Sequence, residues 1–289
     1  MNNLEIEKIS DAVREKGVIS IKDFLKQSDF DLINSNLLNL TKQSKKVYFP
    51  TTSKQYFIKL LKCDFKKIMT SKKLIQIAKD LKLKEIANNV FGQEANLDML
   101  DCYLSKKSNN QILRWHNDLG WNPENHGQAI SKSNSIKNYY KEAFATIDQK
   151  KNNSSGRGIK FFIYMTDIER NNGSLGIIPY SHKIVLALTQ LILEKKVKLE
   201  SYWKLEDLRN FILKKEVKNF LVDIVEEREL ENFLEYSKFI EGSNKDTHDF
   251  DCEMKKNSVV IFDELTVHRG SAPCKNDRLV LRYLYRKKL

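Results

Sequence analysis

A set of short, apolar, strand-like segments constrains the fold of this chain more than any other feature. They cover residues 97–104, 111–116, 159–168, 174–182, 258–263 and 278–286. The strongest of them, IKFFIYMTDI at 159–168, has the length and the aromatic and β-branched content of a buried strand. Segments with helical periodicity precede and interrupt the strands instead of alternating with them. The pattern predicts antiparallel strands and disfavours a repeating βαβ sheet, and no G-x-G-x-x-G motif is present.

The remaining segments predict helices and one long loop. Apolar residues recur at helical spacing over residues 3–45 and 184–240. Residues 70–91 predict one amphipathic helix that opens at Thr70 or Ser71 and closes at Gly92. Residues 122–158 are rich in Asn, Ser, Gly and Lys and predict a long loop.

These elements favour one domain of 289 residues, mainly β with helices (α+β), built as a double-stranded β-helix or jelly roll. We expect residues 1–95 to form a helical N-terminal support. Residues 96–183 and 251–289 would form the jelly-roll core, and residues 184–250 a helical insertion that packs as a lid.

Composition excludes several classes of protein. The chain begins without the layout of a secretory signal and has no apolar run long enough to span a bilayer. Its four cysteines form no CxxC pair, which is typical of reduced thiols and predicts a cytoplasmic protein. The net charge of +12 comes from lysines interleaved with acidic residues, a pattern that disfavours nucleic-acid binding. The charge favours an acidic or phosphorylated small-molecule substrate; the oligomeric state is not predicted.

The stretch LRWHNDLGW at 113–121 places two polar side chains inside an apolar segment. On an extended strand His116 and Asp118 project from the same face, while Asn117 points away. A third candidate ligand, His268, follows the strand at 258–263, and Arg278 comes ten residues later. Two imidazoles and one carboxylate can occupy one face of an octahedral Fe(II) and leave three positions for a 2-oxo acid and dioxygen. An arginine suits the distal carboxylate of such an acid because its guanidinium is planar and two-pronged.

Three segments resemble the phytanoyl-CoA dioxygenase-like family of Fe(II)/2-oxoglutarate-dependent oxygenases. RWHNDLGW is similar to the family's W-H-x-D strand, and TDIERNNGSLGIIPYSHK to its N-G-x-L-x-x-I-P-G-S-H segment, with Tyr180 where glycine is usual. NSVVIFDELTVHRGSAPCKNDR is similar to the segment that carries the second histidine and the arginine. The resemblance extends over residues 113–286 and hardly includes the insertion.

The resemblance implies roles for individual residues. His116, Asp118 and His268 would be the metal ligands that bind Fe(II), and 2-oxoglutarate and O2 would be the co-substrates. Arg278 would pair with the distal carboxylate of 2-oxoglutarate. Arg282, four residues further on the same strand, takes that role if the register is shifted.

Two further residues have smaller implied roles. Ser271 would help the arginine through its hydroxyl group. Asn117 would lie near the co-substrate or act only as a structural amide. Because Asp118 is a carboxylate and not a small residue, the resemblance disfavours halogenation.

Several alternatives remain open. The same iron site could perform desaturation, epimerisation or ring formation in place of hydroxylation. A metal-free jelly roll that binds a ligand without turnover is a second alternative, and a basic nucleic-acid-associated protein is a third. Trp115 and Trp121 are expected to be packing residues, and His182 a structural residue. His126 and His248 lie in polar, loop-like segments and are not expected to bind iron.

Overall fold

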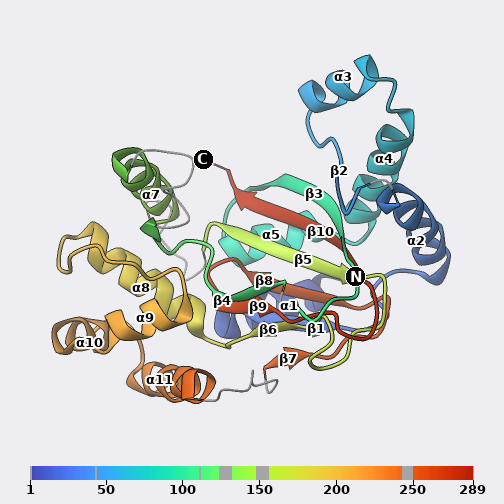
Figure 1. Ribbon diagram of the computed structural model, residues 1–289. Helices are drawn as coiled ribbons and strands as arrows, with labels where there is room; N and C mark the ends of the chain where they lie inside the picture. The colour runs from blue at the N-terminus through green and yellow to red at the C-terminus, as the bar shows by residue number, and fades with distance from the viewer. Residues whose placement is uncertain are drawn as a thin grey trace.

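The protein is described here from a computed structural model, which describes residues 2–42, 44–110, 112–123, 132–147, 156–242 and 250–288. Two antiparallel sheets face each other at its centre (Figure 1). Helices from the N-terminal region cover one sheet, and a second group of helices gathers at the other end of the molecule. The architecture is a mixed α+β fold with two antiparallel sheets, and it is consistent with a jelly roll.

The larger sheet has six strands in the order β1-β8-β5-β10-β3-β2. Their bounds are Val18–Ile21, Val259–Asp263, Gly158–Tyr164, Arg278–Lys287, Ala95–Ser105 and Lys46–Tyr48. β10 is central and pairs along its length with β3, so that Arg278 lies opposite Ser105 and Arg282 opposite Asp101. The sheet therefore joins strands from the start, the middle and the end of the chain.

The smaller sheet has four strands in the order β4-β9-β6-β7. Their bounds are Leu113–His116, His268–Gly270, Leu175–Ile177 and Asp251–Cys252. In this sheet His116 of β4 lies directly opposite His268 of β9. The space between the sheets is filled by an apolar cluster that includes Phe162, Tyr164, Phe262 and Val280.

Five helices of the N-terminal region lie on the side of the outer face of the larger sheet, and four of them pack in its core. They are α1 (Asn3–Lys16), α2 (Gln27–Thr41), α3 (Ser53–Leu61), α4 (Phe65–Asp80) and α5 (Leu83–Phe91). Buried apolar residues from α1, α2, α4 and α5 join the outward side chains of β5, β8 and β10 in one core. α3 contributes no buried residue and stands away from the sheets (Figure 1).

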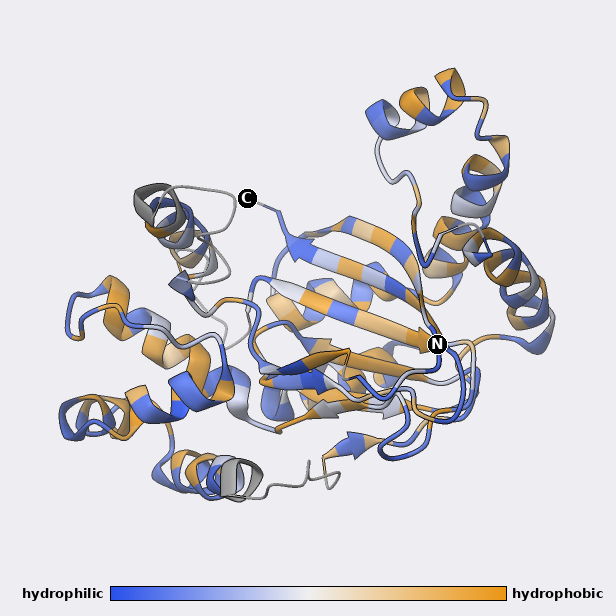
Figure 2. Cartoon of the chain, viewed as in Figure 1, coloured by the Kyte–Doolittle hydropathy of each residue, from blue (hydrophilic) through white to orange (hydrophobic). Residues whose placement is uncertain are grey.

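A second helical group packs beside the smaller sheet. It consists of α7 (Lys132–Ile147), α8 (Ser181–Leu193), α9 (Leu205–Ile212), α10 (Lys215–Val222) and α11 (Glu227–Gly242). Its apolar core also contains Trp115 and Trp121, which are packing residues as the sequence suggests. Alternating hydrophilic and hydrophobic residues are visible along these helices (Figure 2).

The structure corrects three expectations about the elements. Residues 70–91 form two helices, because Lys82 adopts a left-handed conformation (φ 57°) between α4 and α5. Thr70 and Ser71 are buried within α4 and do not open it, whereas Gly92 does close α5. The segment 174–182 is a strand only at β6, and α8 begins at Ser181.

The third correction concerns residues 122–158, which were expected to form a loop. Lys132–Ile147 is helical because Tyr139 and Ala143 are buried on one face and pack against the insertion. Residues 124–131 and 148–155 lie outside the described residues. Among the helices that the structure describes, none combines the length and apolar composition needed to span a bilayer.

Candidate metal centre

The smaller sheet brings three candidate ligands together. His116 ends β4, His268 begins β9, and the antiparallel pairing sets the two imidazole rings 4.4 Å apart between centroids. Asp118 follows two residues after His116, and its Oδ1 lies 3.8 Å from His116 Nε2. Its Oδ2 lies 3.8 Å from His268 Nε2. One donor atom from each residue lies within 4.8 Å of the other two, so these residues form a possible metal site.

Backbone contacts orient both imidazole rings. His116 Nδ1 lies 2.7 Å from the carbonyl oxygen of Arg114, and His268 Nδ1 lies 2.8 Å from the carbonyl oxygen of Thr266. A carbonyl only accepts, so each Nδ1 carries the hydrogen and each Nε2 keeps its lone pair. Both lone pairs are directed to the side where Asp118 lies, which is the arrangement that a metal-ligating histidine requires.

Electrostatics favours the ligating protonation states. Burial lowers the pKa of His268 to about 3, although the nearby Asp118 carboxylate opposes this change. Burial also lowers the pKa of His116 against the same opposing influence. For Asp118 burial would raise the pKa, but the Lys160 ammonium and the two histidines hold it below its usual range. At neutral pH the site therefore has two neutral imidazoles and one carboxylate, and no proton must leave before a cation binds.

Lys160, which sequence reasoning missed, forms an ion pair with Asp118. It lies on β5 of the larger sheet, and its side chain is only 15% exposed. Its ammonium lies 5.7 Å from the ring centroid of Phe262, and that ring is 5.3 Å from His268. The alternation of side chains along β5 places Lys160 on the same face as Phe162 and Tyr164. A lysine within an apolar strand is visible in the sequence, but its contact with Asp118 depends on how β5 faces the smaller sheet.

The two candidate arginines of β10 have different partners. Arg282 donates two hydrogen bonds to the buried Asp101 carboxylate, from Nε at 2.7 Å and from a terminal nitrogen at 2.6 Å. Arg278 is 4% exposed, and among the described residues no carboxylate pairs with it. Its Nε lacks a hydrogen-bond partner, and its guanidinium carbon lies 5.5 Å from the ring centroid of Tyr164. Arg278 is thus the arginine whose charge remains available to a ligand.

Two further buried polar atoms lie beside Arg278. The hydroxyl of Tyr164 and the hydroxyl of Ser105 both lack a hydrogen-bond partner in the described part of the chain. Ser105 lies directly opposite Arg278 across the β3–β10 pair, so both side chains leave from one face. Buried polar groups rarely remain unsatisfied in proteins, so this cluster indicates a polar ligand.

Gly173 allows the approach of its turn to Arg278. It has φ +75°, and an added Cβ would lie 3.0 Å from Arg278 Cδ. A larger residue would be strained in this conformation and would press on the arginine. The turn between β5 and β6 therefore depends on glycine at this position.

Ser271 and Asn117 hold the structure around the site. The Ser271 hydroxyl lies 2.8 Å from that of Ser174, which donates to Asp251. The Asn117 side chain donates to the carbonyl oxygen of Tyr202 at 2.7 Å and accepts from the Gly120 amide at 2.6 Å. Asn117 therefore points away from Asp118 and contacts the helical insertion.

The insertion itself reaches the candidate ligand His116, which sequence reasoning did not predict. Its Trp203 ring lies 4.8 Å from the His116 ring between centroids. The Trp203 carbonyl accepts from the Asn117 amide, and Lys204 forms an isolated β-bridge with His116. An added Cβ on Gly120 would lie 2.5 Å from Trp203 Cα, so only glycine permits this contact.

His182 lies away from the three ligands. Its Nε2 lies 3.0 Å from the carbonyl oxygen of Arg14, at the end of α1. The arrangement is structural and joins the start of α8 to α1. His126 and His248 lie outside the described residues.

A model of the phytanoyl-CoA dioxygenase family matches residues 13–274, which is most of the chain and includes all three candidate ligands. The chain belongs to the phytanoyl-CoA dioxygenase family. No curated protein matches the sequence. Family membership and the His-Asp-His cluster together support an oxygenase-type enzyme that uses iron and 2-oxoglutarate.

Solved structures of low sequence identity share the fold of this family member. HygX from Streptomyces hygroscopicus, solved with nickel and 2-oxoglutarate bound, has a TM-score of 0.52 and 13% identity over 100% of this chain and 88% of its own. The epimerase SnoN from nogalamycin biosynthesis has a TM-score of 0.51 and 11% identity over 99% of this chain and 84% of its own. EctD from S. alaskensis has a TM-score of 0.52 and 12% identity over 99% and 77%.

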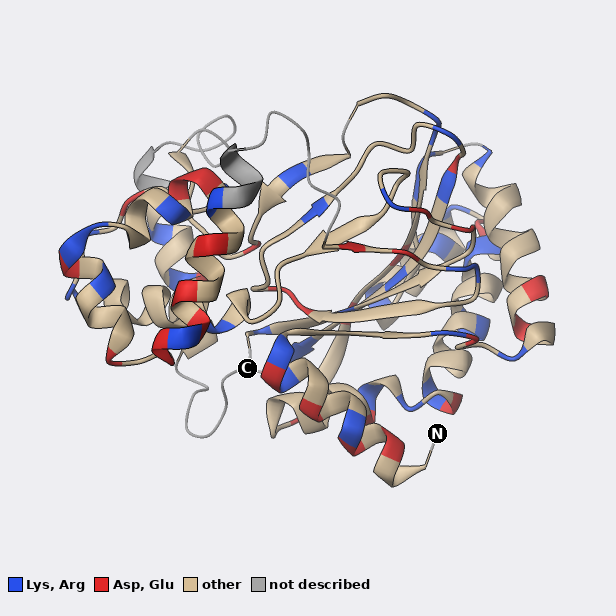
Figure 3. Ribbon diagram, turned by 90° about the horizontal axis from the view of Figure 1, so that it is seen from below, with Lys and Arg blue, Asp and Glu red and all other residues tan. Residues whose placement is uncertain are grey.

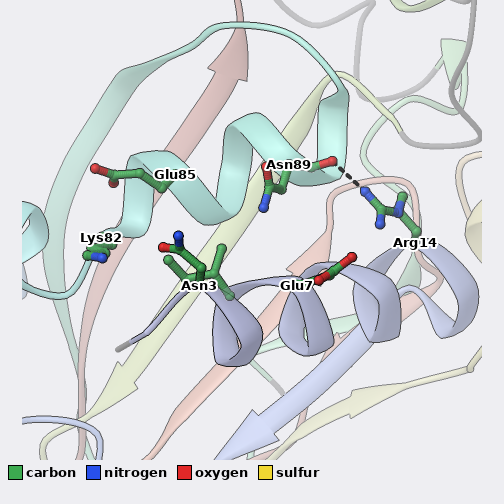
Figure 4. Close-up of a pocket in the computed structure, with 7 residues that line it drawn as sticks. Asn3, Glu7, Arg14, Lys82, Glu85 and Asn89 are labelled. Carbon is green, nitrogen blue, oxygen red and sulfur yellow. Dashed lines mark hydrogen bonds between the residues drawn. The ribbon is translucent and has the colours of Figure 1, made fainter.

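A separate groove lies between α1 and α5, on the outer side of the larger sheet. Its volume is about 520 Å³, and Figure 4 shows Glu7 and Arg14 from α1 facing Lys82, Glu85 and Asn89 from the α5 region. Arg14 donates to the backbone carbonyl of Asn89 across it. The groove holds both charge signs and contains none of the candidate metal ligands.

Proposed function

We propose that this chain is an Fe(II)- and 2-oxoglutarate-dependent dioxygenase that hydroxylates an unactivated C–H bond of a small metabolite. The observation that carries the proposal is the convergence of donor atoms from His116, Asp118 and His268 within 4.8 Å. Two imidazoles and one carboxylate on one face are the ligand set of non-haem Fe(II) oxygenases. Fe(II) held by these residues would supply the activation of dioxygen, whose two oxygen atoms are the oxidant for the 2-oxo acid and for the substrate.

The residues of the chain would bind and orient the reactants. The Nε2 atoms of His116 and His268 would bind the metal together with the ionised Asp118. Arg278 would bind the distal carboxylate of 2-oxoglutarate through two parallel N–H···O bonds, and the hydroxyls of Tyr164 and Ser105 would complete its hydrogen bonding. Arg282 would not serve as the anchor, because Asp101 already uses its guanidinium.

The substrate would lie beside the three candidate ligands, where Trp203 of the insertion approaches His116. Trp203 would form an aromatic wall beside His116 and help to exclude water. The Asp118 side chain is 31% exposed, so solvent reaches this carboxylate. When a cation binds Asp118, the Lys160 ammonium becomes available to an anionic group. This geometry, with the net charge of +12, supports a carboxylated or phosphorylated metabolite as substrate.

Two alternatives use the same residues. Desaturation or epimerisation would differ from hydroxylation only in where the substrate is held. A non-catalytic ligand-binding protein is favoured by one observation, the ion pair between Lys160 and Asp118, because this pair neutralises the carboxylate without a metal.

The test combines metal binding with turnover. Cobalt(II) titration of the purified protein should give the visible absorption of a bound high-spin ion, and iron with 2-oxoglutarate and oxygen should yield succinate. The variants His116→Ala and Asp118→Ala should lose both signals. His182→Gln, at a buried histidine away from the ligands, is the matched control and should keep both. If the unmodified protein binds no metal, or if succinate forms equally in both site variants, the proposal is wrong.

A further inference from the structure

The hairpin of α3 and α4 exposes a concentrated apolar surface. Six large apolar side chains within residues 57–69 are more than a third exposed, out of fifteen such residues in the described chain. They are Phe57, Ile58, Leu60, Leu61, Phe65 and Met69. We call these six residues the hairpin surface. Scattered exposed apolar residues are ordinary, but the concentration of six of them in one helical hairpin is typical of a binding surface.

Local hydrogen bonds, and not the burial of apolar side chains, hold α3 in place. Thr52 caps the helix, and a reciprocal pair of hydrogen bonds with Gln55 completes a capping box. The Tyr56 hydroxyl lies 2.8 Å from that of Ser71, which donates to the Pro50 carbonyl at 2.6 Å. Polar contacts therefore fix α3 on α4, while every apolar residue of α3 stays outside the core. Figure 1 shows α3 standing away from both sheets, and Figure 2 shows its hydrophobic residues.

The hairpin is also strongly basic. Residues 53–73 contain seven lysines and one acidic residue, Asp64. Asp64 pairs with Lys59 and Lys67, and Lys73 pairs with Asp29 on α2. No described carboxylate pairs with the remaining lysines, which are exposed: Lys54, Lys62, Lys66 and Lys72. Elsewhere on the surface, Lys and Arg are interleaved with Asp and Glu (Figure 3). The hairpin thus joins exposed apolar groups to uncompensated positive charge.

We propose that the hairpin surface docks the enzyme onto an anionic lipid bilayer. On α3 the apolar residues span an arc of about 160° at 100° per residue, which is broader than the narrow stripe that a helix presents to a protein groove. Broad apolar arcs flanked by lysines are typical of helices that lie in the lipid interface. Anionic headgroups would pair with the four free lysines. A second copy of the chain is a poor occupant, because a two-fold contact would oppose two lysine-rich surfaces.

Vesicle binding by the full chain tests the proposal. We expect co-sedimentation with phosphatidylcholine vesicles that contain about 30% phosphatidylserine, and little with phosphatidylcholine alone. The variant Phe57→Ser/Leu61→Ser should reduce the partition coefficient at least roughly ten-fold, because both side chains would enter the interface. Leu4→Ser/Leu213→Ser replaces exposed leucines on α1 and after α9 and should bind normally.

Charge reversal on the hairpin provides a second, independent test of the proposal. Lys62→Glu/Lys66→Glu should reduce binding to the anionic vesicles roughly ten-fold or more, at about one kcal/mol per basic residue near the surface. Lys8→Glu/Lys215→Glu makes the same charge change elsewhere and should have little effect. Metal binding should be unchanged in all variants, so this outcome is separate from that of the proposed reaction.

Four results would overturn the proposal. The first is absence of binding to the anionic vesicles, and the second is equal loss in hairpin and control variants. The third is a dimer in light scattering that Phe57→Ser/Leu61→Ser converts to a monomer, which would assign the surface to a second copy. The fourth is retention on immobilised polyglutamate that the hairpin variants abolish, without vesicle binding, which would assign the hairpin surface to an acidic protein.

Discussion

The contrast between Arg278 and Arg282 gives a prediction with opposite signs at two arginines of one strand. Arg282 forms a two-pronged ion pair with the fully buried Asp101, whereas Arg278 is buried without a carboxylate partner in the described chain. Removing one member of a buried pair leaves an uncompensated charge and costs about 3–5 kcal/mol. Lys46 lies 3.6 Å from Asp101 and would compensate in part. We therefore expect Arg282→Met to lower the free energy of unfolding by about 3 kcal/mol.

For Arg278→Met the same reasoning predicts no loss of stability in the ligand-free protein. The substitution removes a buried charge whose hydration is not replaced by an ion pair, so the free energy of unfolding should rise by about 1 kcal/mol. The affinity of Arg278→Met for 2-oxoglutarate, in contrast, should fall. Loss of a two-pronged, desolvated carboxylate contact costs about 3 kcal/mol, or roughly 100-fold in Kd.

Two measurements check this contrast. Urea unfolding of the ligand-free variants gives the stabilities, and calorimetric titration of 2-oxoglutarate into the manganese-loaded protein gives Kd. Arg278→Lys serves as a control that keeps the positive charge but loses the two-pronged guanidinium. It should weaken the binding of 2-oxoglutarate by an intermediate amount. The reasoning is refuted if Arg278→Met destabilises the protein as much as Arg282→Met does. It is also refuted if folded Arg282→Met, and not Arg278→Met, loses 2-oxoglutarate.

Three further predictions concern the surroundings of the site. Burial lowers the pKa of His182 to about 4 from an ordinary value of 6.5. As the pH falls, the His182 imidazole is therefore protonated in the unfolded chain before it is protonated in the folded protein, and this favours unfolding. The stability difference between the protein and His182→Gln should shrink by about 3 kcal/mol between pH 6.5 and 4, and parallel urea curves would contradict this. Lys160→Met should raise cobalt(II) affinity on the order of ten-fold, because an ammonium near Asp118 repels the cation; weaker binding would mean that Lys160 orients the carboxylate. Gly120→Ala should destabilise the protein by about 2 kcal/mol and alter tryptophan fluorescence, because its Cβ would collide with the Trp203 backbone; unchanged unfolding and emission would contradict the contact.

The proximity of the three candidate ligands could be predicted from sequence because strand pairing follows from local patterns. The side-chain alternation along a strand predicted that His116 and Asp118 lie together, and the apolar strand at 258–263 predicted that His268 follows the end of a strand. In the structure Asp118 lies just beyond the end of β4, yet its oxygens still reach both histidines.

The contacts that depend on tertiary packing could not be predicted. Lys160 lies in an apolar strand and gains its role only because β5 faces Asp118 across the two sheets. The choice between Arg278 and Arg282 depended on Asp101, which belongs to a strand paired with β10 and far from it in sequence. Strands β1 and β2 were missed for a similar reason. They are short and lie among helices, and only pairing with β8 and β3 makes them strands.

The contact between the insertion and His116 has a consequence for how reactants enter. The backbone of residues 202–204 forms hydrogen bonds with Asn117 and a β-bridge with His116, so any outward movement of α8–α11 would pull on the segment that carries His116 and Asp118. A helical group attached in this way would form a fixed wall of the site and not a mobile cover. Because the Asp118 side chain is 31% exposed, we expect reactants to enter the site beside this carboxylate.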